Sequence, residues 1–121
     1  MSAAVVVGVG LLGGVGAVAR FMLDGAVASR VAGAFPFGTL AVNLSGALAL
    51  GVLTGAGVGD DVLRLVGTGL LGGYTTFSTW MLESHRLGED GRVRAGLANV
   101  VVSLVLGVAL AWLGDRIGGL L

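Results

Sequence analysis

The stretch GGYTTFSTW, residues 72–80, holds the densest group of side chains that could do chemistry. It combines a glycine pair with serine, threonine and aromatic residues, at the end of an otherwise apolar run. Gly-Gly followed by hydroxyl residues can interrupt a membrane helix, and the freed carbonyls can then bind a cation while the freed N–H groups bind an anion. The alternative is a continuous helix in which each threonine hydroxyl bonds to the preceding turn. The composition of the stretch leaves both interpretations open.

Two asparagines stand in runs that are otherwise almost entirely apolar. Asn43 lies within AVNLSGALAL and Asn99 within a later run, and each has a hydroxyl residue four positions away, Thr39 and Ser103 respectively. Because residues four apart share one face of a helix, each pair is predicted to face the same way. An amide in a membrane can join two helices through a hydrogen bond, or it can donate to an anion. The joining role is favoured for each asparagine considered alone.

The charged residues are bunched and leave long uncharged gaps, which predicts an all-α membrane protein. Hydrophobic residues make up 55% of the chain and charged residues only 12%, about half the charged share of a soluble domain. A spanning helix requires roughly 20 mostly apolar residues, and the four gaps have room for four such helices. The predicted spans are Ala3–Leu23, Gly38–Leu53, Leu65–Leu82 and Ala95–Leu113. The connection 84–94 is predicted to be a loop, and residues 1–121 to form a single domain.

Charge and composition exclude several classes of function. The formal net charge is zero, so no nucleic-acid partner is expected. The chain has no cysteine, which excludes a disulfide framework and a thiolate metal site. No nucleophile–base pair is apparent, and the single histidine, His85, is predicted to stand alone in a charged loop, so no enzymatic activity is expected. The N-terminus lacks a basic region, and its apolar run is therefore predicted to be a span rather than a cleaved signal peptide.

The arginines in the connections give a weak orientation signal. Arg30, Arg86, Arg92 and Arg94 are predicted on one side of the membrane, and Arg64 and Arg116 on the other. The positive-inside rule places the first side in the cytoplasm.

Three motifs occur in a fixed order within the four predicted spans. They are GGVGAVAR at 13–20, GTLAVNLSG at 38–46 and GGYTTFSTW at 72–80. With these motifs the whole chain resembles the Fluc/CrcB family of fluoride channels. The resemblance implies four transmembrane helices, the third broken near its middle, in an antiparallel dual-topology dimer. It also implies two pores along the dimer interface that let fluoride leave the cell passively across the cytoplasmic membrane.

The resemblance also implies a set of pore residues. Asn43 corresponds to the pore asparagine, and Phe77 to a phenylalanine whose ring edge faces fluoride. Trp80 stands where the family has a second such phenylalanine, and its indole offers either a ring edge or an N–H donor. Asn99 stands where a pore tyrosine is expected, and Gly107 where relatives have a serine. The full predicted set is Asn43, Phe77, Trp80, Thr39, Ser103, Asn99, Thr76 and Ser78.

A structural sodium ion at the dimer centre is the implied cofactor. By position, the backbone carbonyls of Gly72 and Thr75 would hold it. A pore for a small, strongly hydrated anion must replace its water with donors and still release the ion. Neutral amides, hydroxyls and ring edges suit that requirement, and a nearby cation lowers the cost of the buried anion.

Two alternatives remain at this stage. The departures at Trp80 and Asn99, with the arginine bias, would suit a non-conducting or partly conducting subunit paired with a paralogous chain, although a homodimer is favoured. A small multidrug-type transporter would need a carboxylate within the membrane to exchange protons for cations. No Asp or Glu lies inside any of the four predicted spans.

Overall fold

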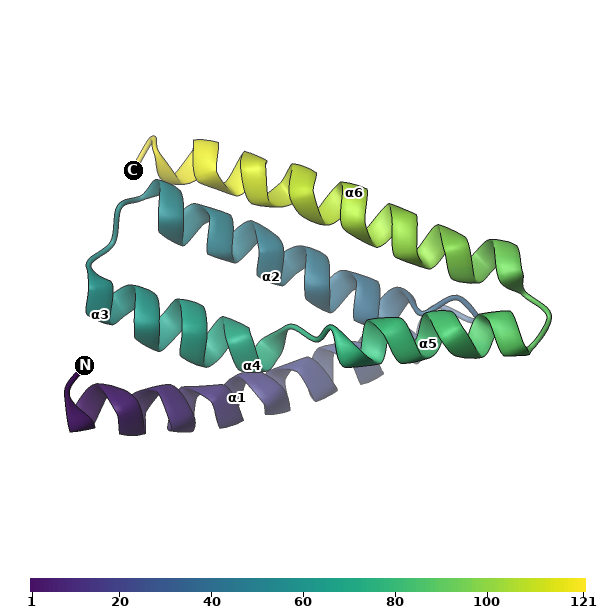
Figure 1. Ribbon diagram of the computed structural model, residues 1–121, viewed down its shortest axis with the longest axis horizontal. Coiled ribbons are helices and arrows are strands. Elements are labelled where there is room, and N and C mark those ends of the chain that lie inside the picture. The colour runs from purple at the N-terminus through teal and green to yellow at the C-terminus, as the bar shows by residue number, and fades with distance from the viewer.

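The computed structural model describes all residues from Met1 to Leu121 as an elongated, entirely helical molecule (Figure 1). Three long helices run along it: α1 (Ala3–Ala28), α2 (Phe37–Gly55) and α6 (Val93–Gly118). The side chain of Ser2 caps α1 by accepting the N–H of Val5 at 3.2 Å. A glycine with positive φ occurs in each connection between the spans, at Gly33, Gly57 and Gly91, where other residues would be strained.

The third span is interrupted, as the resemblance to the Fluc/CrcB family implied and as one of the two interpretations of residues 72–80 allowed. It consists of α3 (Asp60–Val62), the wide π-helical turns η1 (Leu63–Leu71), α4 (Gly72–Tyr74) and, after a gap, α5 (Ser78–Glu89). At Thr75 the backbone is extended, with φ −81° and ψ 159°. The gap at residues 75–77 lies near the middle of the molecule, where Figure 1 shows a thin non-helical segment between α4 and α5.

Glycines allow two pairs of helices to touch through their backbones. A Cβ at Gly16 of α1 would collide with the Leu70 carbonyl oxygen, and one at Gly73 with the Gly13 carbonyl oxygen. Between α2 and α6, a Cβ at Gly51 would collide with the carbonyl oxygen of Ala111. Small residues permit such close packing where lipid provides no hydrophobic drive for association. These contacts hold α1 against the first half of the third span and α2 against α6.

The helices extend beyond the predicted spans. The predicted loop at 84–94 is wrong for its first half, because α5 continues to Glu89 and only residues 90–92 connect it to α6. His85 therefore lies on a helix, with its Nε2 2.6 Å from Glu89 Oε1 one turn later. Likewise α1 runs to Ala28, beyond the predicted end at Leu23, so that it includes Asp24. Charged residues can continue a helix into the interface, and hydropathy alone stops too early there.

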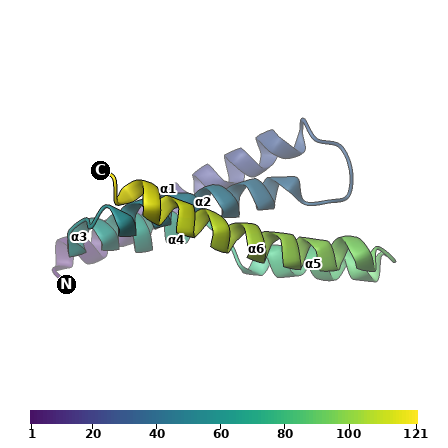
Figure 2. The same ribbon diagram turned by 90° about the horizontal axis from the view of Figure 1, so that it is seen from above.

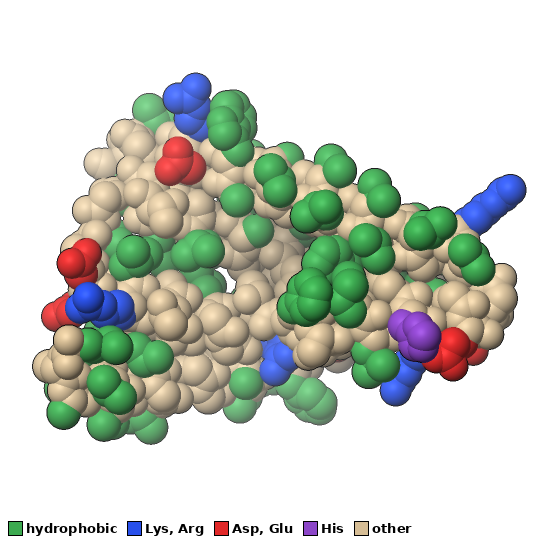
Figure 3. Space-filling model, in the orientation of Figure 1, with side chains coloured by type: hydrophobic (Ala, Val, Ile, Leu, Met, Phe, Trp, Pro, Cys, Tyr) green, Lys and Arg blue, Asp and Glu red, His purple; other side chains and the backbone are tan.

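Three helices, α1, α2 and α6, are long and apolar enough to cross a membrane. The third predicted span does not reach that length because its break divides it into shorter pieces. In the space-filling view, acidic side chains lie toward the two ends and hydrophobic side chains cover much of the face between them (Figure 3). Seen from above, the α1–α2 hairpin diverges from the α5–α6 pair at one end (Figure 2).

Candidate functional site

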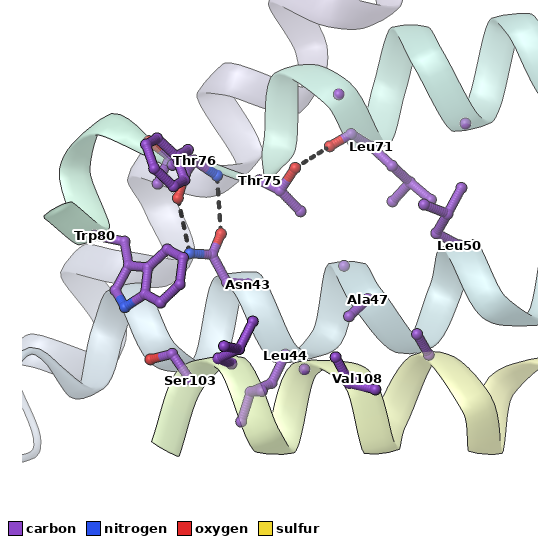
Figure 4. Close-up of a pocket in the computed structure, with 17 residues that line it drawn as sticks. Asn43, Leu44, Ala47, Leu50, Leu71, Thr75, Thr76, Trp80, Ser103 and Val108 are labelled. Atoms are coloured by element: carbon purple, nitrogen blue, oxygen red, sulfur yellow. Dashed lines mark hydrogen bonds between the residues drawn. The ribbon is translucent and has the colours of Figure 1, made fainter. Parts of the chain in front are cut away.

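An open groove of about 450 Å³ runs beside the break in the third span. Helices α2 and α6 and the third span with its break line the groove, and most of its surface is apolar. Figure 4 shows the polar residues at one end and aliphatic side chains such as Leu50 and Val108 along the rest. Five predicted pore residues line this groove: Asn43, Thr76, Phe77, Trp80 and Ser103. The structure thus brings together residues from three helices that are far apart in the sequence.

The amide of Asn43 bridges the break in the third span. Its Nδ2 donates to the Thr76 carbonyl at 2.8 Å, and its Oδ1 accepts the Thr76 N–H at 2.8 Å (Figure 4). This side chain therefore satisfies the donor and the acceptor of one interrupted residue. The second hydrogen of the amide is not needed for this pair, since an asparagine NH₂ carries two donors. Asn43 is both a brace for the break and a residue with a donor to spare.

The two carbonyls predicted to hold a cation are among those that lose their helical partners at the break. In a continuous helix, the N–H of Thr76 would donate to Gly72 and that of Thr79 to Thr75. Here Thr76 N–H donates to Asn43, and Thr79 N–H donates to Thr76 Oγ1 at 3.2 Å. Gly72 and Thr75 also line the groove. Neutral carbonyl oxygens are suitable ligands for a hard cation, so these residues fit a sodium ion chemically.

The Thr75 hydroxyl does not join the groove as a free donor. It donates to the Leu71 carbonyl at 2.9 Å, one turn back in the same segment (Figure 4). This is the local back-bonding that the alternative of a continuous helix would have used. The break and the back-bond therefore occur side by side.

A smaller cavity of about 170 Å³ lies on the other side of Thr76. The predicted pore residue Thr39, which is buried, lines this cavity rather than the groove. Arg20 and Asp24 of α1 and Thr79 of α5 line it as well. Arg20 thus lies beside the predicted pore hydroxyls of Thr39 and Thr76. Thr76 is the residue that borders both spaces.

Asn99 and Ser78 lie outside both spaces. Asn99 is 1% exposed and donates from Nδ2 to the Ser84 hydroxyl at 2.8 Å, which joins α6 to α5. Ser78 is exposed at the start of α5. Within the chain, Asn99 thus plays the joining role that its position in an apolar run favoured.

The indole of Trp80 is placed with its N–H away from the groove. Nε1 donates to the backbone carbonyl of Asn99 at 3.1 Å. Direct donation from this N–H to an ion, one of the two options considered for Trp80, is therefore wrong for this arrangement. The ring packs against Phe77 edge to face, with centroids 5.7 Å apart and planes at 86°. Phe77 itself is 70% exposed in the single chain.

Two polar residues near the site were missed. Glu83, one residue beyond the predicted third span, lies on α5 with Oε1 buried and without a hydrogen-bond partner. The absence of a carboxylate from the predicted spans therefore depended on ending the third span too early. Ser84, the partner of Asn99, was assigned to the loop. Its spacing of four residues from Trp80 was the available signal, because such residues share a helical face.

The fold and the groove define a class: a small helical membrane protein with a third span broken beside a cluster of neutral donors. Residues 7–115 match the family described as CrcB-like protein, Camphor Resistance (CrcB). The chain belongs to this family. With its long apolar helices, it is a multi-pass protein of the cell membrane.

Curated relatives cover nearly the whole chain. "Fluoride-specific ion channel FluC 2" of Mycolicibacterium paratuberculosis is 57% identical over 117 residues, which are 97% of this chain and 96% of the relative. The protein of the same name from Mycobacterium bovis is 54% identical, over 97% of this chain and 93% of the relative. "Fluoride-specific ion channel FluC 1" of Symbiobacterium thermophilum is 44% identical, over 91% and 94% respectively.

Proposed function

We propose that this chain is a fluoride-selective passive channel that lets fluoride leave the cell. Two copies in opposite orientations form a dimer, and two pores run along the surfaces where they meet. The observation that carries the proposal is the groove, in which Asn43, Thr76, Ser103 and the Phe77–Trp80 pair gather beside the break. Relatives that share about half of the sequence bear the name of fluoride-specific channels.

The chemistry of the groove suits a small halide. Its donors are an amide and hydroxyls, and its aromatic pair offers ring edges with positive polarity. None of the residues that line this groove is charged. Neutral donors can replace the water around fluoride without holding the ion too tightly to leave, which conduction requires. A fixed arginine at the same place would bind the anion more strongly and slow its release.

The shape of the groove supports a second copy as the missing wall. The groove is open along the molecule, and Phe77 is 70% exposed beside it. A conducting route through lipid would need protein on all sides, because polar groups cannot face hydrocarbon unpaired. An inverted copy would add the same donors from the other direction, and the weak arginine bias permits both orientations.

A sodium ion at the centre of this dimer is part of the proposal. The Gly72 and Thr75 carbonyls would hold it, because the hydrogen bonds of the break draw away their helical donors. When bound, the ion would supply positive charge near both pores. Replacing sodium by a large organic cation during purification and assay should lower fluoride efflux, and returning sodium should restore it. Full efflux without any sodium would contradict this part.

The experiment that tests the function uses the purified chain alone in liposomes. A fluoride-loaded vesicle should release fluoride down its gradient, and a chloride-loaded vesicle should not release chloride. Empty vesicles provide the control. Chloride release at a similar rate, or no fluoride release, would contradict the proposal of a self-sufficient fluoride channel.

A second candidate is a heterodimer with a paralogous chain. The numbers in the relatives' names, FluC 1 and FluC 2, are the observation that favours considering it. The chain has no cysteine, so a single Ala34→Cys substitution in the exposed α1–α2 connection reports its orientation. Labelling of about half of the molecules from outside is expected for the homodimer. Labelling of all or none, with efflux only after a paralogous chain is added, would favour the heterodimer.

A further inference from the structure

Trp80 lines the groove with its ring, but its only strong donor is directed into the protein. The indole N–H donates to the Asn99 carbonyl at 3.1 Å. This carbonyl belongs to a residue that is 1% exposed and does not line the groove. A carbonyl oxygen has two lone pairs, so it can accept the indole in addition to its helical N–H. The groove side of Trp80 is therefore a carbon edge.

A closed loop of hydrogen bonds fixes this arrangement. The Ser84 hydroxyl donates to the Trp80 carbonyl at 2.8 Å. The Asn99 amide then donates to the Ser84 oxygen at 2.8 Å, and Ser103 Oγ lies 3.4 Å from Asn99 Oδ1. The loop runs from the Trp80 side chain to Asn99, from Asn99 to Ser84, and from Ser84 back to Trp80. It fixes the register of α5 against α6, and therefore the position of the Asn99 carbonyl that accepts the indole N–H.

We propose that Ser84 and Asn99 are positioning residues that turn the Trp80 N–H away from the anion and leave a carbon ring edge toward the groove. This inference rests on the proposed fluoride conduction. The tryptophan then acts toward the anion as a phenylalanine would. The perpendicular packing on Phe77, at 5.7 Å between centroids, depends on the same orientation.

The orientation of the indole decides how strongly the groove binds fluoride. An N–H is a true hydrogen-bond donor, whereas a ring edge carries only part of a positive charge. A freed N–H would add a strong donor in a site with little water, where hydrogen bonds to an anion are strengthened. Binding that is too tight slows the exit of the ion. We call the loop of hydrogen bonds through Trp80, Asn99 and Ser84 the clamp. Its loss should therefore slow fluoride efflux and make the indole N–H resonance sensitive to fluoride.

The first measurement follows the indole N–H directly. Trp112→Phe leaves Trp80 as the single tryptophan, since the chain has two. In ¹H–¹⁵N spectra of this protein, the indole N–H should be protected from exchange, and added fluoride should not move its resonance. Ser84→Ala should speed its exchange about tenfold or more, because a hydrogen bond of the clamp is lost. It should also make the resonance shift with fluoride.

The second measurement is efflux in a double-mutant cycle. Ser84→Ala should slow fluoride efflux about five- to tenfold in the Trp80-containing protein, as expected for one lost hydrogen bond. In the Trp80→Phe background, the same substitution should not change the rate further. Ser84→Thr keeps the hydroxyl and should restore efflux. Asn99→Leu provides a second disruption from α6 and should act in the same direction as Ser84→Ala.

Ser29→Ala is the matched control. Its hydroxyl donates to the Ala26 carbonyl at 2.8 Å within the exposed end of α1, far from α5 and α6 in the sequence. It should alter neither the indole exchange nor the efflux.

Two results would overturn the clamp. One is a wild-type indole resonance that moves with fluoride, and the other is an equal effect of Ser84→Ala with and without Trp80. Absence of any efflux by the unaltered chain would contradict the proposed function instead, and the exchange measurement would still decide the clamp.

Discussion

The two sides of the broken third span are built on opposite principles. Toward α1, the backbone meets backbone: Gly16 lies against Leu70, and Gly73 against Gly13, with no room for a Cβ. Toward the groove, the backbone is interrupted, and side chains of Asn43 and Thr76 complete its hydrogen bonds. One side is closed by the absence of side chains, and the other is kept open by polar ones.

The difference separates what holds the fold from what shapes the site. The glycine side gains from close packing, which supports helix association in lipid. The groove side accepts an interrupted helix, and such backbone survives in a membrane only where protein or a wet cavity surrounds it. Substitutions on the glycine side should therefore change stability first, and those on the groove side should change conduction first.

Asn43→Asp should have the largest effect. It keeps an acceptor for the Thr76 N–H, loses the donor to the Thr76 carbonyl and places a negative charge beside the groove. A charge at membrane depth costs several kcal/mol and repels an anion, so fluoride efflux from liposomes should fall below detection. Gel filtration and circular dichroism should confirm a folded protein. Normal efflux would show that Asn43 is only a structural brace.

Gly16→Ala should act through stability. The new Cβ would collide with the Leu70 carbonyl oxygen and approach the Tyr74 nitrogen at 2.8 Å. Overpacking of this kind typically costs about 1–3 kcal/mol, which a denaturation curve in detergent would measure. Gly14→Ala is the matched control two residues away, because a Cβ there meets nothing within 4 Å. Equal stability of the two variants would contradict the backbone contact.

The residues at the break marked it as a possible break because its cause is local, but they left a continuous helix open as well, and the family resemblance decided between the two. Two glycines followed by Thr75 and Thr76 weaken a helix and offer hydroxyls as substitute partners, and both effects operate within a few residues. The spacing of Thr39 and Asn43 predicted a shared face. Yet Thr76 separates the cavity of Thr39 from the groove of Asn43. Which space a side chain enters depends on the neighbouring helices, and the spacing of residues along one helix carries no information about those neighbours.

For the same reason, the hydrogen-bond partners of individual polar groups could not be predicted from the sequence. Nothing in the residues around Trp80 indicates that its N–H meets the carbonyl of Asn99, nineteen positions later. The helix through Ser84 and His85 was missed because hydropathy falls where the charges begin. The loss of apolar character marks the membrane boundary, and the hydrogen-bonded helix continues past it to Glu89.

Thr76→Val should have a moderate effect that tests the groove side without adding charge. The substitution removes the oxygen that accepts the Thr79 N–H at 3.2 Å and pairs with the Thr79 hydroxyl at 3.1 Å. An unsatisfied donor costs about 1 kcal/mol or more, and efflux should fall about tenfold. Thr54→Val removes a hydroxyl bonded only to Gly51 of its own helix and is the control. Unchanged efflux in Thr76→Val would place the break's function in its backbone alone.

His85→Ala should have the smallest effect, because the His85–Glu89 pair lies neither on the glycine side nor on the groove side of the third span. His85 and Glu89 form a contact of 2.6 Å, but their side chains are 72% and 62% exposed. Solvent screens such pairs, and their contribution is less than about 1 kcal/mol. Both the denaturation midpoint and the efflux rate should therefore stay close to those of the unaltered chain. A large loss of stability would show that the charged end of α5 depends on this pair, and that the packing of α5 on α6 through Trp80, Ser84 and Asn99 is not what holds it.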